Sequence, residues 1–395
     1  MPGDASGTTP PGMTPLEAEI RSRIALEGPM SVADYMALCL GHPVHGYYRA
    51  RQPFGRAGDF VTAPEISQMF GELLGLWAVE TWRRMGAPCA IRLVELGPGR
   101  GTLMRDALRA AGRAPDFVEA IELDLVESSP RLAALQKETI GRPGAWRAAF
   151  AEVPDGPLLL IANEFFDALP VRQFVRLNRG FHERVVGLAR DRLVFGLSPV
   201  AVPAVPVEGK PVEAEPVKTV PVETIPVETV PEGAVVEVSP ASRRLMHDIA
   251  ARVTRFGGAA LVVDYGHVRT GPGETLQAVR GHAFADPLAE PGFADLTAHV
   301  DFAALAGAAR EAGAVPLGPV TQGDFLKALG IELRAEQLMR AAGPERAAVI
   351  ASELRRLTDS QDMGRLFKVL CVAAPGLVPP PFEFLENSRA SETSR

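Results

Sequence analysis

Residues 93–103 read Leu-Val-Glu-Leu-Gly-Pro-Gly-Arg-Gly-Thr-Leu, and this stretch decides the fold class of the chain. Its first residues belong to an apolar run that predicts a buried strand. The three glycines at alternate positions predict a tight turn, because glycine adopts conformations that other residues avoid and leaves space for a ligand beside the main chain. The helix expected from Thr102 presents unpaired N–H groups and a partial positive charge at the same place. The stretch therefore predicts a nucleotide-type binding site.

The spacing of the glycines separates two kinds of nucleotide site. A dinucleotide fingerprint, G-x-G-x-x-G, would require its third glycine at position 102, which is Thr102 in this chain. The chain instead has Glu95-x-Gly97-x-Gly99-x-Gly101, which resembles the first motif of S-adenosylmethionine-dependent methyltransferases. The pattern alone leaves a second interpretation open, in which these residues form only a structural turn between a strand and a helix.

The composition is that of a soluble globular protein, with 47 % apolar and 23 % charged residues. The net charge of −7 argues against nucleic acid as a partner, because proteins that bind a phosphate backbone usually carry a basic patch. No run approaches the ~18 apolar residues of a membrane span. Neither nucleic-acid binding nor membrane insertion is therefore expected.

The cysteines and residues 1–13 indicate the cellular compartment of the protein. Cys39, Cys89 and Cys371 lie far apart and are odd in number, which predicts neither a metal site nor a disulfide framework and fits a reducing environment. Residues 1–13 contain no Arg and resemble neither a signal peptide nor a transit peptide. We expect them to form a disordered leader, and we expect a cytoplasmic protein.

From residue 89 onward the pattern alternates between strands and helices, which predicts an α/β fold with a mostly parallel sheet and helices on both faces. Together with the glycine motif, this alternation predicts a Rossmann-like class I methyltransferase fold. The expected strands are residues 91–96, 119–126, 157–162 and 259–264. The expected helices between them are residues 102–111, 130–139 and 241–255.

A different pattern interrupts this alternation. Three short strands joined by tight turns, at residues 171–177, 181–188 and 192–197, predict an antiparallel meander. A low-complexity segment follows, with a proline at every fifth residue from Pro206 to Pro231. Prolines at this density disfavour both helix and central strand. The segment is either a docking arm or an expanded surface loop.

An N-terminal layer of helices is expected before the sheet, and further helices are expected in the last third of the chain. Thr14-Pro15-Leu16-Glu17 is a capping box with proline at the first helical position. Ser31 is predicted to cap a second helix, and a longer helix is predicted over residues 65–85. The remaining expected elements are helices at residues 300–312, 321–329, 331–341 and 344–357 and a final strand at residues 366–372.

These elements divide the chain into four parts. The parts are a leader (1–13), an N-terminal helical subdomain (14–88), the methyltransferase core (89–374) and a flexible tail (375–395). The core is expected to contain the meander at residues 171–197 and a proline-rich insert at residues 198–232.

The binding of a methyl donor suggests which residues contact it. Ligands of open α/β sheets bind outside the carboxyl ends of the strands, and an acid at the end of the second strand accepts hydrogen bonds from the ribose hydroxyls. Glu127 follows the second expected strand and fits this requirement. The residues expected to bind S-adenosylmethionine are Glu95, Gly97, Pro98, Gly99, Gly101, Thr102, Glu127, Ser128 and Asn163.

The third expected strand is followed by Asn163-Glu164-Phe165-Phe166-Asp167. Two carboxylates and an amide at the ligand-binding edge of a sheet predict a site for the methyl acceptor. The alternative is a solvated polar loop after a buried strand. Asp264 ends the strand at residues 259–264 in the same way and gives a weaker signal.

Residues 58–67, Gly-Asp-Phe-Val-Thr-Ala-Pro-Glu-Ile-Ser, resemble the signature of the MidA-like methyltransferase family. Four further pieces resemble this family in the same order. They are residues 93–101, 163–170, 295–302 and 363–370. The resemblance extends from about Gly28 to Val372, and the proline-rich insert is the departure, although it touches none of the motifs.

The resemblance implies an S-adenosylmethionine-dependent methyltransferase that acts on arginine side chains of a protein. The mitochondrial member of the family is a complex I assembly factor, so a respiratory complex I subunit is the implied substrate. The resemblance also implies that residues 58–67 fold over the cofactor, with Asp59, Thr62 and Glu65 near it.

Arginine chemistry adds a constraint. The guanidinium pKa is at least 12, so removal of its proton at pH 7 before attack would cost at least ~7 kcal/mol. The proton is therefore better lost during or after methyl transfer, while carboxylates hold and aim the cation. We expect Glu164 and Asp167 to do this, with Glu65 as a third candidate. His299 is either the acceptor of the released proton or a hydrogen-bonded structural histidine.

Two other functions are alternatives to this one. A non-catalytic assembly factor could keep the fold as a cofactor-binding module, but the presence of both cofactor residues and acceptor-side acids favours an enzyme. A nicotinamide-dependent dehydrogenase would need a glycine at position 102. No metal is expected. A homodimer is compatible with the Ala-rich helices, but no heptad seam supports it, so the oligomeric state stays open.

Overall fold

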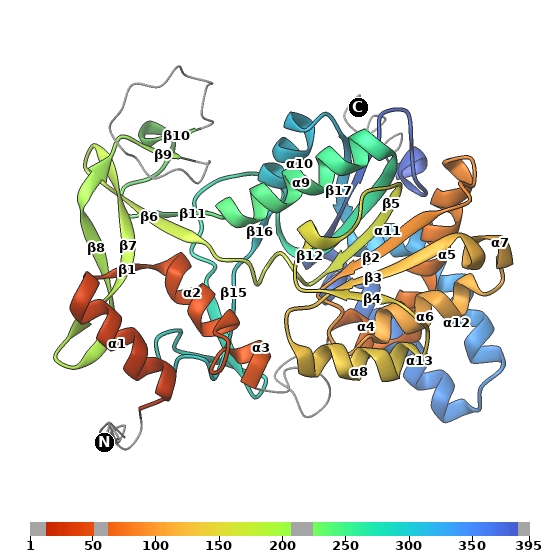
Figure 1. Cartoon of the computed structure of the whole chain (residues 1–395), viewed down its shortest axis with the longest axis horizontal. Helices are drawn as coiled ribbons and strands as arrows, with labels where there is room; N and C mark the ends of the chain where they lie inside the picture. Colours follow the sequence, from red (N-terminus) through yellow and green to blue (C-terminus); the bar gives the residue numbers. More distant parts are fainter. Residues whose placement is uncertain (1–12, 51–61, 207–223, 386–395) are drawn as a thin grey trace, which may run out of the picture.

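The computed structural model describes residues 13–50, 62–206 and 224–385, which form two lobes (Figure 1). The core lobe is an eight-stranded sheet with helices on both faces. The meander lobe combines an antiparallel sheet with two N-terminal helices, α1 (Pro15–Glu27) and α2 (Val32–Gly41). Asp59, residues 1–12 of the expected leader, the middle of the proline-rich insert and the end of the expected tail lie outside the described residues.

The centre of the core sheet is parallel, which confirms the predicted α/β class. Its strands follow the order β17-β18-β12-β5-β2-β3-β4, with the short β16 beside β12. β18 pairs antiparallel with β12, and β17 pairs antiparallel with β18. The strands are β2 (Ile91–Leu96), β3 (Ile121–Val126), β4 (Ala145–Arg147), β5 (Leu158–Asn163), β12 (Gly258–His267), β16 (Val300–Asp301), β17 (Val315–Thr321) and β18 (Phe367–Ala373).

Alternate residues of the central strands enter two different cores, because successive side chains of a strand point to opposite faces. Leu93 and Leu159 pack in one core, and Val94 and Leu160 pack in the other. The first core is covered by α5 (Gln68–Arg84), α6 (Thr102–Ala111), α7 (Pro115–Ala120), α8 (Pro130–Ile140), α11 (Gln322–Ala328), α12 (Ile331–Arg340) and α13 (Pro344–Thr358). The second core is covered by α9 (Pro240–Phe256) and α10 (Phe302–Glu311).

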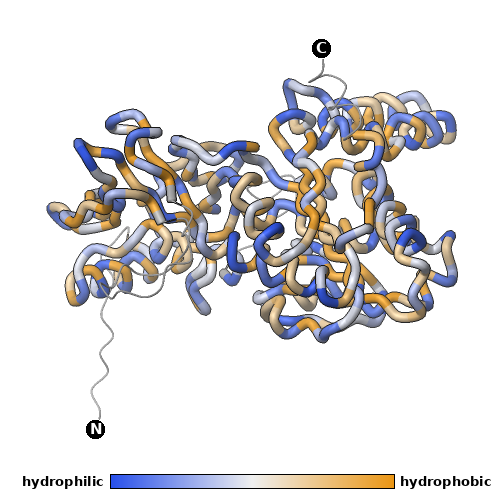
Figure 2. The backbone as a smooth tube through the Cα atoms, turned by 90° about the horizontal axis from the view of Figure 1, so that it is seen from above, coloured by the Kyte–Doolittle hydropathy of each residue, from blue (hydrophilic) through white to orange (hydrophobic). Residues whose placement is uncertain are grey.

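The predicted meander is present in the second lobe. Its strands are β6 (Arg172–Leu177), β7 (Gly180–Ala189) and β8 (Arg192–Val202), joined by β1 (Met30–Ser31) and β11 (Val235–Val238). A small sheet of β13 (Gln277–Arg280), β14 (Ala283–Ala285) and β15 (Asp295–Thr297) lies in the same lobe. Figure 2 views the molecule from above and shows hydrophobic stretches in both lobes, as expected when each lobe has its own core.

The N-terminal helices do not form one layer on the core sheet. Leu16 of α1 and Tyr35 of α2 are buried against the meander lobe, whereas Trp77 of α5 is buried in the core lobe. The helix expected over residues 65–85 is divided into α4 (Ala63–Ile66) and α5. Ser67 separates them, because its backbone is extended (φ −152°, ψ 138°) and its side chain caps Met69 N–H.

Other elements differ in their length or were not predicted. The strand expected from residue 119 begins at Ile121, because Pro115 starts the short helix α7 before it. β13, β14, β15 and β17 were not predicted. The structure also contains α3 (Tyr47–Ala50), α14 (Met363–Leu366) and the two-stranded pair β9 (Ala204–Pro206) and β10 (Thr224–Pro226). Within the described ranges, no helix has the length and apolar character that a membrane span requires.

Candidate active site

Two neighbouring cavities lie at the carboxyl ends of β2, β3 and β5. The larger, of about 480 Å³, has walls from both lobes, because Leu40 of α2 and Tyr48 of α3 face Glu127 and Phe165 of the core lobe across it. The smaller, of about 40 Å³, is lined by the glycine turn, by residues of α4 and by the acids Glu95 and Glu164. Gly97, Gly99 and Glu164 line both cavities. We call these the large and the narrow cavity.

The glycine turn has the conformation that its sequence predicts. Gly97, Gly99 and Gly101 all have positive φ, at 60°, 54° and 81°. A Cβ at Gly97 would lie 2.8 Å from the ring of Phe165, and one at Gly101 would lie 3.3 Å from Gln136 Cα. Side chains are therefore disfavoured here by both backbone conformation and space. The turn leads directly into α6, whose first N–H groups have no side-chain cap from Gly101.

Glu127 is fixed in place at the tip of β3. Its Oε1 accepts a hydrogen bond from Ser129 N at 2.7 Å, and its Oε2 accepts one from Gln136 Nε2 at 3.0 Å. Gln136 Nε2 also donates to the carbonyl of Gly99 at 2.9 Å. Burial raises the pKa of Glu127, and the hydrogen bonds from Ser129 and Gln136 oppose this rise. Gln136 thus ties the expected ribose-binding acid to the glycine turn.

Sequence reasoning missed Gln136. It lies on the buried face of a helix that was predicted from apolar spacing, and it is fully buried. Its Oε1 accepts a hydrogen bond from Trp146 Nε1 at 2.9 Å, and its Nε2 donates to Gly99 and Glu127, which line the large cavity. The sequence did contain one signal for Gln136, which is a single amide side chain on a helix face whose other residues are apolar.

Glu95 lies at the bottom of the narrow cavity. Its side chain is buried, and Oε2 has no hydrogen-bond partner among the described residues. Burial raises the pKa of Glu95 to about 8. A buried polar atom without a partner is costly, so a ligand that donates to this oxygen would be favoured.

The other residues expected at the cofactor fall around the same two cavities. Thr62, Pro98, Thr102 and Asn163 line the narrow cavity, and Ser128 lines the large one. Gly101 lines neither of these two cavities and acts through the shape of the turn. Of the eleven expected residues, only Asp59 lies outside the described part of the chain.

Glu164 has the most unusual geometry of the acceptor-side residues. It is a non-glycine residue with φ of 48°, and its side chain lines both cavities. Its Oε1 accepts hydrogen bonds from Ala63 N at 3.0 Å and Asn163 Nδ2 at 3.2 Å. Burial raises the pKa of Glu164 to about 7. Residues held in such conformations concentrate at functional sites.

Asp167 occupies a different environment. Its side chain is 6 % exposed and belongs to the lining of neither cavity. Its Oδ2 accepts a hydrogen bond from the Tyr265 hydroxyl at 2.7 Å, and burial raises the pKa of Asp167 to about 6. Glu164 and Asp167 are therefore not brought together to hold one ligand group.

Glu65 and His299 are also separated. Glu65 lines the narrow cavity, where its Oε1 accepts a hydrogen bond from the Thr102 hydroxyl at 2.5 Å, so it links α4 to the start of α6. His299 lines neither cavity and stacks edge-on against Tyr265, with ring centroids 5.5 Å apart. Burial lowers the pKa of His299. This environment matches the structural alternative for His299.

Comparison with known proteins defines the class of the chain. The Methyltransf_28 family of S-adenosyl-L-methionine-dependent methyltransferases matches residues 73–320, and the chain belongs to this family. In a solved crystal structure, a member of the COG1565 superfamily from Burkholderia thailandensis is bound to S-adenosyl-homocysteine. That structure covers 92 % of both chains, with a TM-score of 0.74 and 29 % identity. The chain is a methyltransferase that uses S-adenosyl-L-methionine.

Named relatives lead to a more particular group. Protein arginine methyltransferase NDUFAF7 homolog, mitochondrial, of Drosophila melanogaster is 37 % identical over 95 % of this chain and 88 % of its own length. Protein arginine methyltransferase NDUFAF7, mitochondrial, of Mus musculus is 37 % identical over 90 % of this chain and 83 % of its own. The Homo sapiens protein of the same name is 33 % identical over 97 % and 87 %.

The expectation of a cytoplasmic protein is wrong. Relatives that match about 90 % of the chain are named as mitochondrial proteins. The expectation depended on the cysteine pattern and on the composition of residues 1–13. A reducing environment is not unique to the cytoplasm, so the cysteine pattern does not identify the compartment. A targeting sequence is recognised independently of the fold, so the composition of residues 1–13 does not identify it either.

The residues of the two cavities fit the methyl donor. The turn leaves little room for side chains at Gly97 and Gly101, Glu127 lies at the tip of the second strand, and Glu95 offers a buried oxygen without a partner among the described residues. A cationic, hydroxyl-rich ligand matches this set of acceptors. Glu127 would accept from the ribose hydroxyls, and Glu95 would face the charged end of the ligand.

Proposed function

We propose that this chain methylates an arginine side chain of a protein substrate. The observation that carries the proposal is Glu164, a carboxylate in a left-handed conformation at the junction of the two cavities. The relatives named protein arginine methyltransferases support the same substrate class. The bound donor supplies an electrophilic methyl group on a sulfonium.

The acceptor must be aimed at that methyl group while it keeps its charge. A guanidinium is a rigid fork of N–H donors that pairs well with a carboxylate. We infer that Glu164 accepts from two guanidinium N–H groups and leaves the third nitrogen directed at the methyl group. Two of the hydrogen-bonding sites of Oε1 are already filled by Ala63 and Asn163, which fixes the orientation of the carboxylate.

The position of the large cavity suggests how a protein substrate reaches this carboxylate. Ala37, Leu40 and Tyr48 of the meander lobe form one wall, and Phe165 and Leu169 of the core lobe form the other. A largely apolar channel between the lobes suits the aliphatic part of an arginine side chain, whose charged end would then meet Glu164. The resemblance to the MidA-like family makes a respiratory complex I subunit the candidate substrate.

The test compares Glu164→Gln with the native protein and with Glu119→Gln, an exposed residue of α7. Glutamine keeps the size of the side chain but lacks the negative charge. We expect Glu164→Gln to bind S-adenosyl-homocysteine with unchanged affinity in calorimetry and to lose ~100-fold or more of arginine methylation measured by mass spectrometry. Normal methylation by this variant would refute the role of Glu164. Absence of methylated arginine with the native protein would favour the non-catalytic assembly factor instead.

A further inference from the structure

Asp264, in the carboxyl-terminal part of β12, is a carboxylate that the proposed chemistry does not use. It is fully buried, and four backbone N–H groups donate to it. Oδ2 accepts from the N–H groups of Phe165, Phe166 and Asp167 at 3.1, 3.0 and 3.3 Å. Oδ1 accepts from the N–H of its neighbour Tyr265 at 2.9 Å. No ion pair to Asp264 occurs among the described residues, so these N–H groups compensate its burial.

Three successive N–H groups that converge on one oxygen require a particular backbone shape. The chain must turn sharply, as in the concave backbone sites that bind anions. Glu164 directly precedes the three donors and has the positive φ of 48° that begins this turn. If the three N–H groups did not all donate to Asp264, the glutamate at position 164 would favour a negative φ, because the left-handed region is costly for residues with a Cβ.

The sheet register brings Asp264 to this turn. Val263 pairs with Asn163 in the parallel ladder of β12 and β5, so Asp264 lies beside Glu164 at the point where β5 ends. The N–H of Glu164 donates to the carbonyl of Val263 at 2.9 Å. The backbone of Glu164 is therefore held on one side by Val263 and on the other by the three N–H groups that bind Asp264.

We propose that Asp264 is the positioning residue of the acceptor site. Its carboxylate folds residues 164–167 into the turn that directs Glu164 to the junction of the two cavities and sends Asp167 toward Tyr265. This inference depends on the proposed function of Glu164, because a positioned carboxylate matters for turnover only if it contacts the acceptor.

The test is a double-mutant cycle with Asp264→Asn and Glu164→Gln. An asparagine at this position has one oxygen for the three N–H groups and sets its amide N–H₂ against the N–H of Tyr265. We expect Asp264→Asn to lower kcat ~100-fold, because small misplacements of an aiming group have effects of this size. Binding of S-adenosyl-homocysteine should stay within about twofold, since Glu95 and Glu127 are untouched.

The decisive readout is the double variant. If Asp264 acts through Glu164, adding Asp264→Asn to Glu164→Gln lowers kcat no further, whereas two independent losses would multiply. Multiplied losses, or normal turnover of Asp264→Asn, overturn the inference while leaving the proposed function intact. Normal turnover of Glu164→Gln alone overturns the proposed function. Asp106→Asn is the matched control, because Asp106 is also a buried carboxylate that lines neither cavity, but it binds Arg105 and Arg109 and not the backbone of residues 165–167.

A second measurement does not require the Asp264 variant to fold. If the turn imposes a left-handed backbone at position 164, Glu164→Gly should have a melting temperature equal to or above that of Glu164→Ala, because alanine is strained there and glycine is not. A clearly higher melting temperature for Glu164→Ala would show that the turn does not impose this conformation, and the inference would fail.

Discussion

Glu95 in the narrow cavity lowers the stability of the empty fold, and the same side chain is available to bind a ligand. Glu95 is buried without a charged partner or a hydrogen bond to Oε2 among the described residues, and burial raises its pKa to about 8. An acid in this state makes the empty fold less stable, because its charge is costly away from water. The same oxygen is ready to accept from a cationic ligand. Residues that bind ligands often lower the stability of the folded protein in this way.

The first prediction concerns Glu95→Gln. In the unfolded chain Glu95 loses its proton near pH 4.5, and in the folded chain near pH 8. The folded state therefore binds more protons between these values, and the native free energy of unfolding falls as pH rises through this window. The full shift corresponds to about 5 kcal/mol at most. We expect Glu95→Gln to gain about 1–3 kcal/mol at pH 8 and little at pH 4.5, measured by urea denaturation.

The same variant should bind the methyl donor more weakly, because an amide lacks the negative charge that attracts a cationic ligand. Calorimetric titration with S-adenosyl-L-methionine measures this loss. A variant whose stability gain is the same at pH 4.5 and pH 8 would contradict the assignment of the gain to the Glu95 proton.

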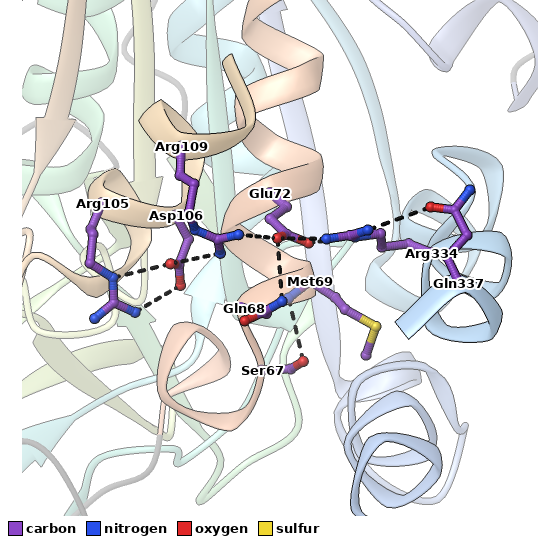
Figure 3. A network of polar contacts seen from close by, with 9 residues as sticks. All are labelled: Ser67, Gln68, Met69, Glu72, Arg105, Asp106, Arg109, Arg334 and Gln337. Carbon is purple, nitrogen blue, oxygen red and sulfur yellow. Dashed lines mark hydrogen bonds and ion pairs between the residues drawn. The ribbon is translucent and has the colours of Figure 1, made fainter. Parts of the chain in front are cut away.

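At the scale of elements, the site depends on helices held together by a second buried carboxylate. Glu72 of α5 accepts from Arg109 Nη1 of α6 at 2.6 Å and from Arg334 Nε of α12 at 2.7 Å (Figure 3). Burial alone would raise the pKa of Glu72, but the hydrogen bonds from Arg334 and Arg109 outweigh it, and this pKa lies below its usual value. We call Glu72, Arg109 and Arg334 the clasp. Because α6 begins at the glycine turn, the clasp holds in place the helix that borders the cofactor site.

The second prediction concerns the clasp. Removing one member of a buried ion pair is costly because its partners lose their charge compensation. Arg109 and Arg334 are partly exposed, which reduces this cost, so we expect Glu72→Gln to lower the free energy of unfolding by about 1–3 kcal/mol in urea denaturation. The control is Glu80→Gln, which breaks only exposed pairs with Arg83 and Arg84 and should change stability by about 0.5 kcal/mol or less. Equal effects of the two variants would show that the clasp adds nothing to the free energy of unfolding.

At the scale of the whole molecule, the large cavity joins the two lobes. Ala37, Leu40 and Gly41 of α2 form part of its wall, although α2 has its core in the meander lobe. A ligand that fills the cavity contacts both lobes at once. Binding should therefore restrict their relative motion as well as the loops of the core lobe.

The third prediction follows from this wall. S-adenosyl-homocysteine at 100 times its Kd should stabilise the protein by about 2.7 kcal/mol. In hydrogen-exchange mass spectrometry, residues 32–41 should exchange more slowly with the ligand, whereas residues 115–120, which line neither cavity, should change much less. Protection confined to the core lobe would show that the ligand does not bridge the lobes.

Local patterns predicted the parallel core, because apolar runs define β2, β5 and β12 without information from elsewhere in the chain, and a glycine turn follows β2. β13, β14 and β15 were missed since strands of three or four residues are too short to have a period. β17 was missed because Pro316, Gly318 and Pro319 interrupt its pattern. In the site, the glycine turn and Glu127 were recognisable locally. Gln136 was missed, because a lone amide on an apolar helix face does not reveal what it contacts. Asp264 gave only a weak signal, because the N–H groups that it binds lie 97–99 residues earlier in the chain.

The pairing of β18 with β12 affects how the protein is made. The ladder runs from Ala259↔Ala373 to Tyr265↔Phe367, so the strand that carries Asp264 is flanked by a segment that is synthesised after the helices from α10 to α13. Chains emerge from the ribosome N-terminus first. A nascent chain can form the glycine turn and pair β12 with β5 before β18, the neighbour of β12 on its other side, has been made. We therefore expect the pairing of β12 with β18 to be a late step of folding during synthesis, after the parallel ladder of β2, β5 and β12 has formed.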